Sequence, residues 1–151
     1  MANYLYDTGR QGFLTTVTVG AFTGQIDWVN DTFGVALLDN STVDFSAGQA
    51  TYASVQDILT QDGNALFART TLTNTTGITG DGTASADDAV FTAVPGPGEA
   101  EAVIIYRDNA TVDADNVLVA YIDSATNLPV TLNGGDVTVV WDAGSGRIFK
   151  L

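Results

Sequence analysis

The sequence predicts an all-β fold, a single antiparallel β-sandwich or barrel-like domain with one short helix. The chain of 151 residues contains 16 Gly, 16 Asp and 21 Thr. Gly and Asp favour turns, whereas Thr favours strands. Two Glu and a single Lys are too few for the polar faces of long helices. Short apolar runs recur between turn signals, as is typical of sandwiches and barrels.

The chain is long enough for one domain with a substantial core. We expect residues 1–25 to form an N-terminal arm or hairpin that packs on the domain or on a neighbour. Residues 26–151 are expected to form the β domain. Within the arm, residues 4–14 are ambiguous, because Gly9 and Gly12 each weaken a helix by about 1 kcal/mol relative to Ala.

Three segments in the first two thirds of the chain predict strands. Residues 33–38 are a compact apolar run between polar turn residues, and residues 65–72 alternate weakly between apolar and polar side chains. In the third segment, apolar residues at every second position indicate one face of a strand: Ala100, Ala102, Ile104 and Tyr106.

The last third of the chain predicts three more strands. Residues 117–122 are apolar on both faces, which indicates a central strand. Val137, Val139 and Trp141 would form the inward face of the next strand, after a hairpin turn at residues 133–135. Residues 147–151 are expected to form a short closing strand, linked through the Gly-rich residues 142–146.

An apolar helical face predicts the one helix, within residues 51–59: Tyr52, Val55, Ile58 and Leu59. Ser54 and Asp57 have the spacing of a capping pair. By contrast, residues 73–86 are dominated by Thr, Gly, Asp and Asn and predict a loop. Residues 94–98, with two prolines, predict a rigid break.

The composition excludes several kinds of chemistry. Without Cys there is no disulfide framework, thiol nucleophile or thiolate zinc site, and without His the usual general base is missing. Five scattered cations cannot neutralise a row of phosphates, so we expect no nucleic-acid partner. No apolar run approaches the ~18–20 residues of a membrane span, and no secretory signal is recognisable. We therefore expect no membrane partner and no enzymatic activity.

Carboxylates are the remaining reactive groups. Three pairs could in principle serve glycoside cleavage: Asp87 with Asp88, Asp113 with Asp115, and Glu99 with Glu101. Sequence neighbours rarely face each other across the required gap, so turn capping is the favoured interpretation. The same oxygen-rich loops would suit calcium, but the D-x-[DN]-x-[DN]-G motif is absent. We expect no cofactor, and calcium stays open as an alternative.

Aromatic residues gather near the start of the chain. Trp28 and Phe33 are expected in the core, whereas the terminal cluster is expected to pack on a neighbouring subunit, because aromatic residues anchor interfaces. The interface candidates are Tyr4, Leu5, Tyr6, Arg10 and Phe13.

Several segments of the chain together carry a family resemblance: residues 1–14, 26–32, 35–39, 98–106, 118–123, 128–131, 133–142 and 147–151. In these segments the sequence resembles small virion structural proteins of tailed bacteriophages, cyanophages among them, some of which serve as capsid cement or decoration proteins. The resemblance covers most of the chain and is strongest at its two ends. Residues 15–25, rich in Thr and Val, depart from the family pattern and would form an extra hairpin. No set of functional residues is carried over.

The resemblance implies a protein that binds the major capsid protein and stabilises the shell by mass action. Symmetric shells favour symmetric partners, so it implies a homo-oligomer, with a trimer favoured. It would be made in the host cytoplasm and reside on the capsid surface of the virion. The net charge of -13 would keep free copies soluble and steer them to basic patches. Two alternatives remain: a tail, collar or head-fibre component, and a carbohydrate-binding module for host attachment.

Overall fold

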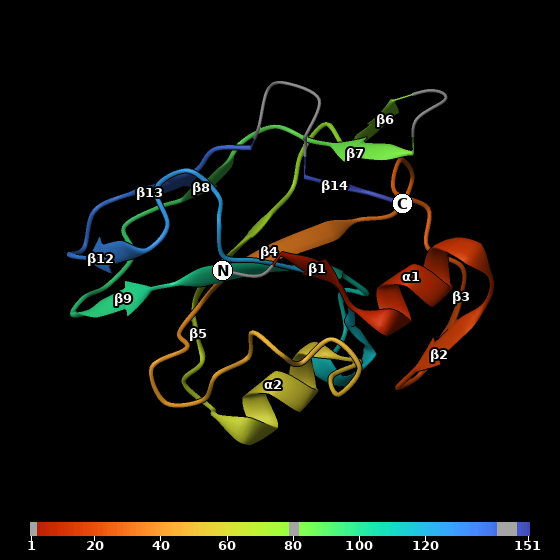
Figure 1. Ribbon diagram of the computed structural model, residues 1–151, viewed down its shortest axis with the longest axis horizontal. Coiled ribbons are helices and arrows are strands. Elements are labelled where there is room, and N and C mark those ends of the chain that lie inside the picture. Colours follow the sequence, from red (N-terminus) through yellow and green to blue (C-terminus); the bar gives the residue numbers. More distant parts are fainter. Residues whose placement is uncertain (1–2, 79–81, 142–147) are drawn as a thin grey trace.

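A five-stranded antiparallel sheet lies at the centre of the protein (Figure 1). The structure is a computed structural model that describes residues 3–78, 82–141 and 148–151. The order of the strands across the sheet is β1-β11-β10-β4-β5. They span Tyr4–Leu5 (β1), Val117–Ile122 (β11), Ala102–Arg107 (β10), Phe33–Leu38 (β4) and Leu66–Thr71 (β5). The strands predicted at residues 33–38, 65–72 and 117–122 are confirmed.

Both faces of this sheet are covered, which explains why β4 and β11 are apolar throughout. All six residues of β4 are buried. Because successive side chains of a strand point to opposite faces, they enter two separate cores. Val35 and Leu37 belong to the core on one face, and Ala36 and Leu38 to the core on the other.

Helix α2, Val55–Gln61, covers one face of the sheet and buries Val55 and Ile58 completely. Its start is a capping box. The Ser54 hydroxyl accepts from the Asp57 N–H at 3.3 Å, and the Asp57 carboxylate accepts from the Ser54 N–H at 2.9 Å. These bonds satisfy two N–H groups that a helix start would otherwise leave unpaired. The predicted helix and capping pair are confirmed, although the helix begins after Tyr52.

Short strands in four small sheets cover the other face (Figure 1). They are β2 (Val17–Val19) with β3 (Phe22–Gly24), β8 (Ala89–Phe91) with β13 (Val137–Val139), β9 (Gly98–Ala100) with β12 (Val130–Leu132), and β7 (Thr83–Ser85) between β6 (Thr76–Ile78) and β14 (Phe149–Lys150). The β2-β3 hairpin agrees with the expectation for residues 15–25. Strand β14 lies in the predicted closing segment, and residues 142–147 of that prediction lie outside the described residues.

The fold is therefore all-β, but it is not clearly a single sandwich, and it has two short α-helices rather than one. The additional helix is α1, Asp7–Leu14, in the segment that sequence patterns left ambiguous. A 3-10 turn, Asp113–Asp115, precedes β11. Gly9 explains why α1 forms where propensity disfavours it. A Cβ on Gly9 would lie 2.7 Å from the Cα of Val119, so only glycine lets the helix approach β11 this closely.

The loop predicted at residues 73–86 is wrong, because this segment contains strands β6 and β7. Strand β7 pairs with β14 at the far end of the chain as well as with β6. Its strand conformation is therefore fixed by a distant partner, which a local pattern of Thr and Gly does not reveal.

Two further expectations need correction. The strand predicted through Ala100 and Tyr106 is divided at Glu101 into β9 and β10, and Ala100 enters the opposite core from Ala102. Residues 133–135 form a bend but no hairpin, since the strands beside it pair elsewhere, β12 with β9 and β13 with β8. Val137, Val139 and Trp141 are buried as predicted.

Candidate functional site

Strand β1 forms one edge of the central sheet and positions the first candidate residues. It pairs with β11, with Tyr4 opposite Tyr121 and Leu5 opposite Ala120. The Tyr6 N–H donates to the Val119 carbonyl at 2.9 Å. The start of the chain is thus anchored on the domain by backbone hydrogen bonds.

Three tyrosines pack together beneath this edge. The ring of Tyr4 stacks on Tyr121 at 4.9 Å and meets Tyr6 edge-on at 5.1 Å. The Tyr4 hydroxyl also donates to the Phe45 carbonyl at 2.7 Å. Tyr6 has no exposed surface, and burial raises its pKa well above the ordinary value. Tyr6 is therefore a core residue within the chain, while Tyr4 and Leu5 are half-buried.

Helix α1 places the other two candidates. Arg10 is exposed and forms an ion pair with Asp7 one turn earlier. Phe13 is half-buried, with its ring 5.7 Å from that of Phe149. The Phe149 ring also lies edge-on to Trp28 at 5.0 Å. These ring contacts connect α1, the C-terminal strand β14 and the core.

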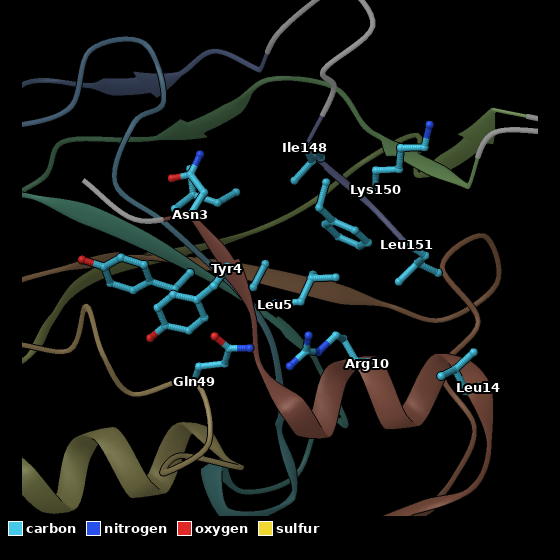
Figure 2. A pocket seen from close by; sticks show the side chains of 13 residues that line it. Asn3, Tyr4, Leu5, Arg10, Leu14, Gln49, Ile148, Lys150 and Leu151 are labelled. Carbon is cyan, nitrogen blue, oxygen red and sulfur yellow. The ribbon is translucent and has the colours of Figure 1, made fainter.

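A cavity of about 580 Å³ lies between these elements, and most of its lining is apolar. Its lining residues are Asn3, Tyr4, Leu5, Arg10, Leu14, Gln49, Ala120, Tyr121, Ile122, Ile148, Phe149, Lys150 and Leu151. Figure 2 shows Leu5 of β1 on one side and Lys150 and Leu151 on the other, with Arg10 and Leu14 along helix α1. The cavity brings together three of the five candidates, Tyr4, Leu5 and Arg10. Tyr6 and Phe13 are not among its lining residues.

Two exposed apolar side chains lie together at this cavity. Among the described residues, five large hydrophobic side chains are exposed: Leu14, Val29, Val90, Val112 and Leu151. Two of them, Leu14 at 81% and Leu151 at 58%, line the cavity. Exposed apolar side chains gathered at a hollow, rather than scattered singly, indicate a binding surface.

The acidic pair Asp113 and Asp115 is engaged in structural contacts. Asp113 accepts two hydrogen bonds from Arg69, at 2.5 and 3.0 Å, and these bonds hold the Asp113 pKa below its usual range. The buried Asp115 carboxylate accepts from the Ala21 N–H at 2.6 Å and from the Thr111 hydroxyl at 3.0 Å. The two side chains therefore bind different segments of the chain.

The other acidic pairs also contact neighbouring polar groups. Asp87 accepts from the amide of Asn74 at 2.5 Å, and Asp88 accepts from the Trp141 N–H at 3.0 Å. Glu101 accepts from the Asn40 N–H at 2.7 Å, whereas Glu99 is exposed. Within the described residues, no three metal-binding side chains come together. These contacts are typical of carboxylates that fix loops.

A second hollow, of about 360 Å³, has four carboxylates in its lining. Its lining includes Asp44, Glu99, Glu101 and Asp123. Glycoside cleavage needs one carboxyl group with a raised pKa. The pKa of Asp44 is instead lowered, by hydrogen bonds from Ser46. Asp44 therefore does not have the property of a general acid.

The sequence was compared with protein families and with curated proteins. Neither the models of protein families nor the sequences of curated proteins include a match to the chain. In the part of the chain that the structure describes, no helix has the length and apolar character needed to cross a membrane. The cavity beside β1 is therefore the feature on which a functional argument rests.

Sequence reasoning missed the C-terminal half of this cavity. Ile148, Phe149, Lys150 and Leu151 face residues 3–5 across the hollow. The two segments lie at opposite ends of the chain, and the closing strand was predicted without its neighbours. The sequence around Leu14 contained a local sign of an exposed apolar residue, because Leu14 is large and apolar and ends a short helix with a polar surface.

Proposed function

We propose that the protein is a capsid cement or decoration protein of a tailed bacteriophage. It binds the major capsid protein on the outer surface of the shell, as a homo-oligomer with a trimer favoured, and its contribution is mechanical rather than catalytic. The resemblance of the sequence to small virion proteins supplies the biological setting for this proposal.

One structural observation carries the proposal: an apolar cavity, rimmed by exposed Leu14 and Leu151, lies beside the edge of the central sheet. Its volume of about 580 Å³ is within the range of binding pockets in proteins. Away from the cavity, five of the six carboxylates in the acidic pairs accept hydrogen bonds from neighbouring groups of the chain. A domain with an apolar hollow at its surface suits adhesion to another protein. Such binding stabilises only the form of the shell that presents the partner surface.

Reconstitution on shells tests this proposal. Phage shells that lack the protein are mixed with purified wild-type chain, and bound protein is measured by co-sedimentation, with shell rupture followed during heating. We expect saturable binding and a higher rupture temperature. The double variant Leu14→Asp/Leu151→Asp is expected to lose binding, because it places charge in the apolar cavity. Val112→Asp is the matched control, because Val112 is as exposed as Leu151 and lies away from the cavity.

Two results would overturn the proposal. One is a wild-type chain that does not sediment with shells at any concentration tested. The other is immunogold labelling of intact particles on the tail or collar instead of the head. Light scattering of the free protein addresses the oligomer separately: a mass of about 15.7 kDa would exclude a stable trimer in solution.

A further inference from the structure

The edge of β1 carries an unpaired backbone at the cavity. In an antiparallel pair, residues alternate between those that bond to the neighbouring strand and those that point away from it. Tyr6 lies opposite Val119 and bonds to it, and Tyr4 lies opposite Tyr121 two residues earlier. Leu5 lies between Tyr4 and Tyr6, so its N–H and carbonyl point away from β11. Among the described residues, no hydrogen bond reaches either group of Leu5. The next outward N–H, that of Asp7, is bonded to the Gln49 carbonyl at 3.1 Å.

Strand β14 presents a second open edge to the same cavity. It pairs on one side with β7, with Lys150 opposite Thr83. The Leu151 N–H donates to the Gly82 carbonyl at 3.0 Å, so the N–H and carbonyl of Lys150 point away from β7. Within residues 3–78, 82–141 and 148–151, these two groups have no hydrogen-bond partner. Figure 1 shows β14 between β7 and the central sheet, and Figure 2 shows Leu5 and Leu151 on opposite sides of the hollow, which Lys150 also lines.

We propose that an extended segment of the capsid protein inserts into this cavity as an additional strand between β1 and β14. The inserted backbone bonds to Leu5 on one side and to Lys150 on the other, and it joins the central sheet to the β14-β7-β6 sheet. This inference rests on the proposed function for the identity of the partner. A described strand of a second copy does not supply the segment, because the inserted strand bonds on both of its edges and every described strand already uses at least one edge within its own chain.

The cavity also defines the chemistry of the inserted segment. Side chains of a strand alternate between its two faces. One face meets the apolar residues Ile148, Phe149 and Leu151 and therefore carries apolar side chains. Arg10 and Lys150 are two of only five cations in a chain of net charge -13, and both line the cavity. No described carboxylate lies within ion-pair distance of Lys150, so we infer an acidic side chain on the inserted segment near it.

Short overlapping peptides that tile the major capsid protein test the inference directly. Each peptide is labelled, and its affinity for the full-length chain is measured by fluorescence polarisation. We expect one peptide, with alternating apolar residues and an acidic residue, to bind. Its binding is expected to protect the amide hydrogens of Leu5 and Lys150 from exchange with solvent. N-methylation of the peptide amide that faces β1 removes one donor and is expected to weaken binding about tenfold.

Variants of the protein separate backbone pairing from side-chain contact. Leu5→Pro removes an N–H that bonds to nothing within the described chain, and it is expected to weaken peptide binding as N-methylation does. Leu5→Ala keeps the N–H and serves as the matched control. Lys150→Glu is expected to weaken binding by roughly threefold, because an exposed ion pair contributes little free energy.

The outcomes distinguish the inference from the proposed function. If shells bind the wild-type chain but no capsid peptide protects the Leu5 and Lys150 amides, the strand insertion is wrong and the cement role stands. If shells do not bind at all, the proposed function fails. If Leu5→Pro dissociates an oligomer of this chain and leaves peptide binding intact, the edge binds a second copy and the inference is overturned.

Discussion

Gly34 shows how a single residue position controls the packing of the central sheet. It lies directly opposite Tyr106 in the pairing of β4 with β10. A Cβ on Gly34 would lie 2.2 Å from the Cζ atom of the Tyr106 ring. The ring thus lies across the glycine and fills the space that a side chain would take.

Gly34→Ala is expected to destabilise the protein by about 1–3 kcal/mol, because the added Cβ would overlap the ring of the almost fully buried Tyr106 and force it to shift. Urea unfolding measures this change. Gly77→Ala is the control, since a Cβ there meets no atom within 4 Å. Its free energy of unfolding is expected to stay within about 1 kcal/mol of the wild type. Equal effects of the two substitutions would contradict the interpretation.

The tyrosine cluster predicts a loss of stability in alkali. Burial raises the pKa of Tyr121 to about 12, and its hydroxyl accepts a hydrogen bond from Asn40 at 2.7 Å. An unfolded tyrosine has a pKa of about 10. Between these values the unfolded chain loses the proton and the folded chain keeps it, so this contribution is complete below about pH 10 and is lost as the pH rises towards 12.

Unfolding titrations in urea at several alkaline pH values check this expectation. The free energy of unfolding of the wild type should fall more steeply above pH 10 than that of Tyr121→Phe, which has no hydroxyl to titrate. Ultraviolet absorbance should show tyrosinate at a lower pH in the unfolded chain than in the folded one. Parallel stability curves for the two proteins would disprove the assignment.

Helix α1 illustrates an element whose packing outweighs its local preference. In an isolated helix, replacing Gly9 by Ala would gain about 1 kcal/mol. Here the Cβ would lie 2.7 Å from the Cα and 2.9 Å from the carbonyl oxygen of Val119. These are backbone atoms of a central strand, which cannot move aside as a flexible side chain could.

Gly9→Ala is therefore expected to lower the free energy of unfolding by about 2 kcal/mol, opposite in sign to the helix preference. Thermal unfolding followed by circular dichroism gives the measurement. In Gly63→Ala the nearest atom lies 3.9 Å away, so this variant should unfold close to the wild-type temperature. A Gly9→Ala protein more stable than the wild type would show that α1 packs differently.

The strands and helices show which parts of the fold could be predicted from sequence patterns. Strands β4 and β11 were predictable because each is a continuous apolar run that a covered sheet requires. Helix α2 was predictable because its capping box and its apolar face are local. Strands β6 and β7 were missed because their pairing with each other and with β14 determines them. Tyr6 was placed at an interface because sequence alone cannot distinguish a buried aromatic residue from an exposed one.

At the scale of the whole molecule, acidic charge dominates. The chain carries a net charge of -13. Three ion pairs lie within the described residues, those of Arg10 with Asp7, Arg69 with Asp113 and Arg107 with Asp31. Repulsion among the remaining carboxylates opposes the compact state, and dissolved salt screens it.

We therefore expect the unfolding temperature at pH 7 to rise by a few degrees as sodium chloride increases from about 10 mM to about 150 mM, where the screening length falls from roughly 30 Å to roughly 8 Å. Differential scanning calorimetry measures the shift. Sucrose at matched osmolality serves as the control for effects other than screening. A decrease with salt would mean that attraction in the three ion pairs exceeds the overall repulsion.

The cavity was the part of the site that no sequence pattern could assemble. Its walls include residues 3–5, helix α1 and residues 148–151, which are brought together by the pairing of β1 with β11 and of β14 with β7 and by the ring contact of Phe13 with Phe149. Tyr4, Leu5 and Arg10 were predictable as candidates because aromatic and charged residues gather near the start of the chain. Their position beside Lys150 follows from the fold alone.

Residues 3–5 and residues 148–151 line one hollow, and this has a practical consequence for engineering. A bulky group attached beside Asn3 or Leu151 would lie at the cavity and obstruct it, because both residues line it. The exposed bend at Gly134, where a Cβ would meet no atom within 4 Å and φ is +88°, offers an insertion point outside the cavity lining. A sequence inserted at that bend is therefore expected to leave the cavity open.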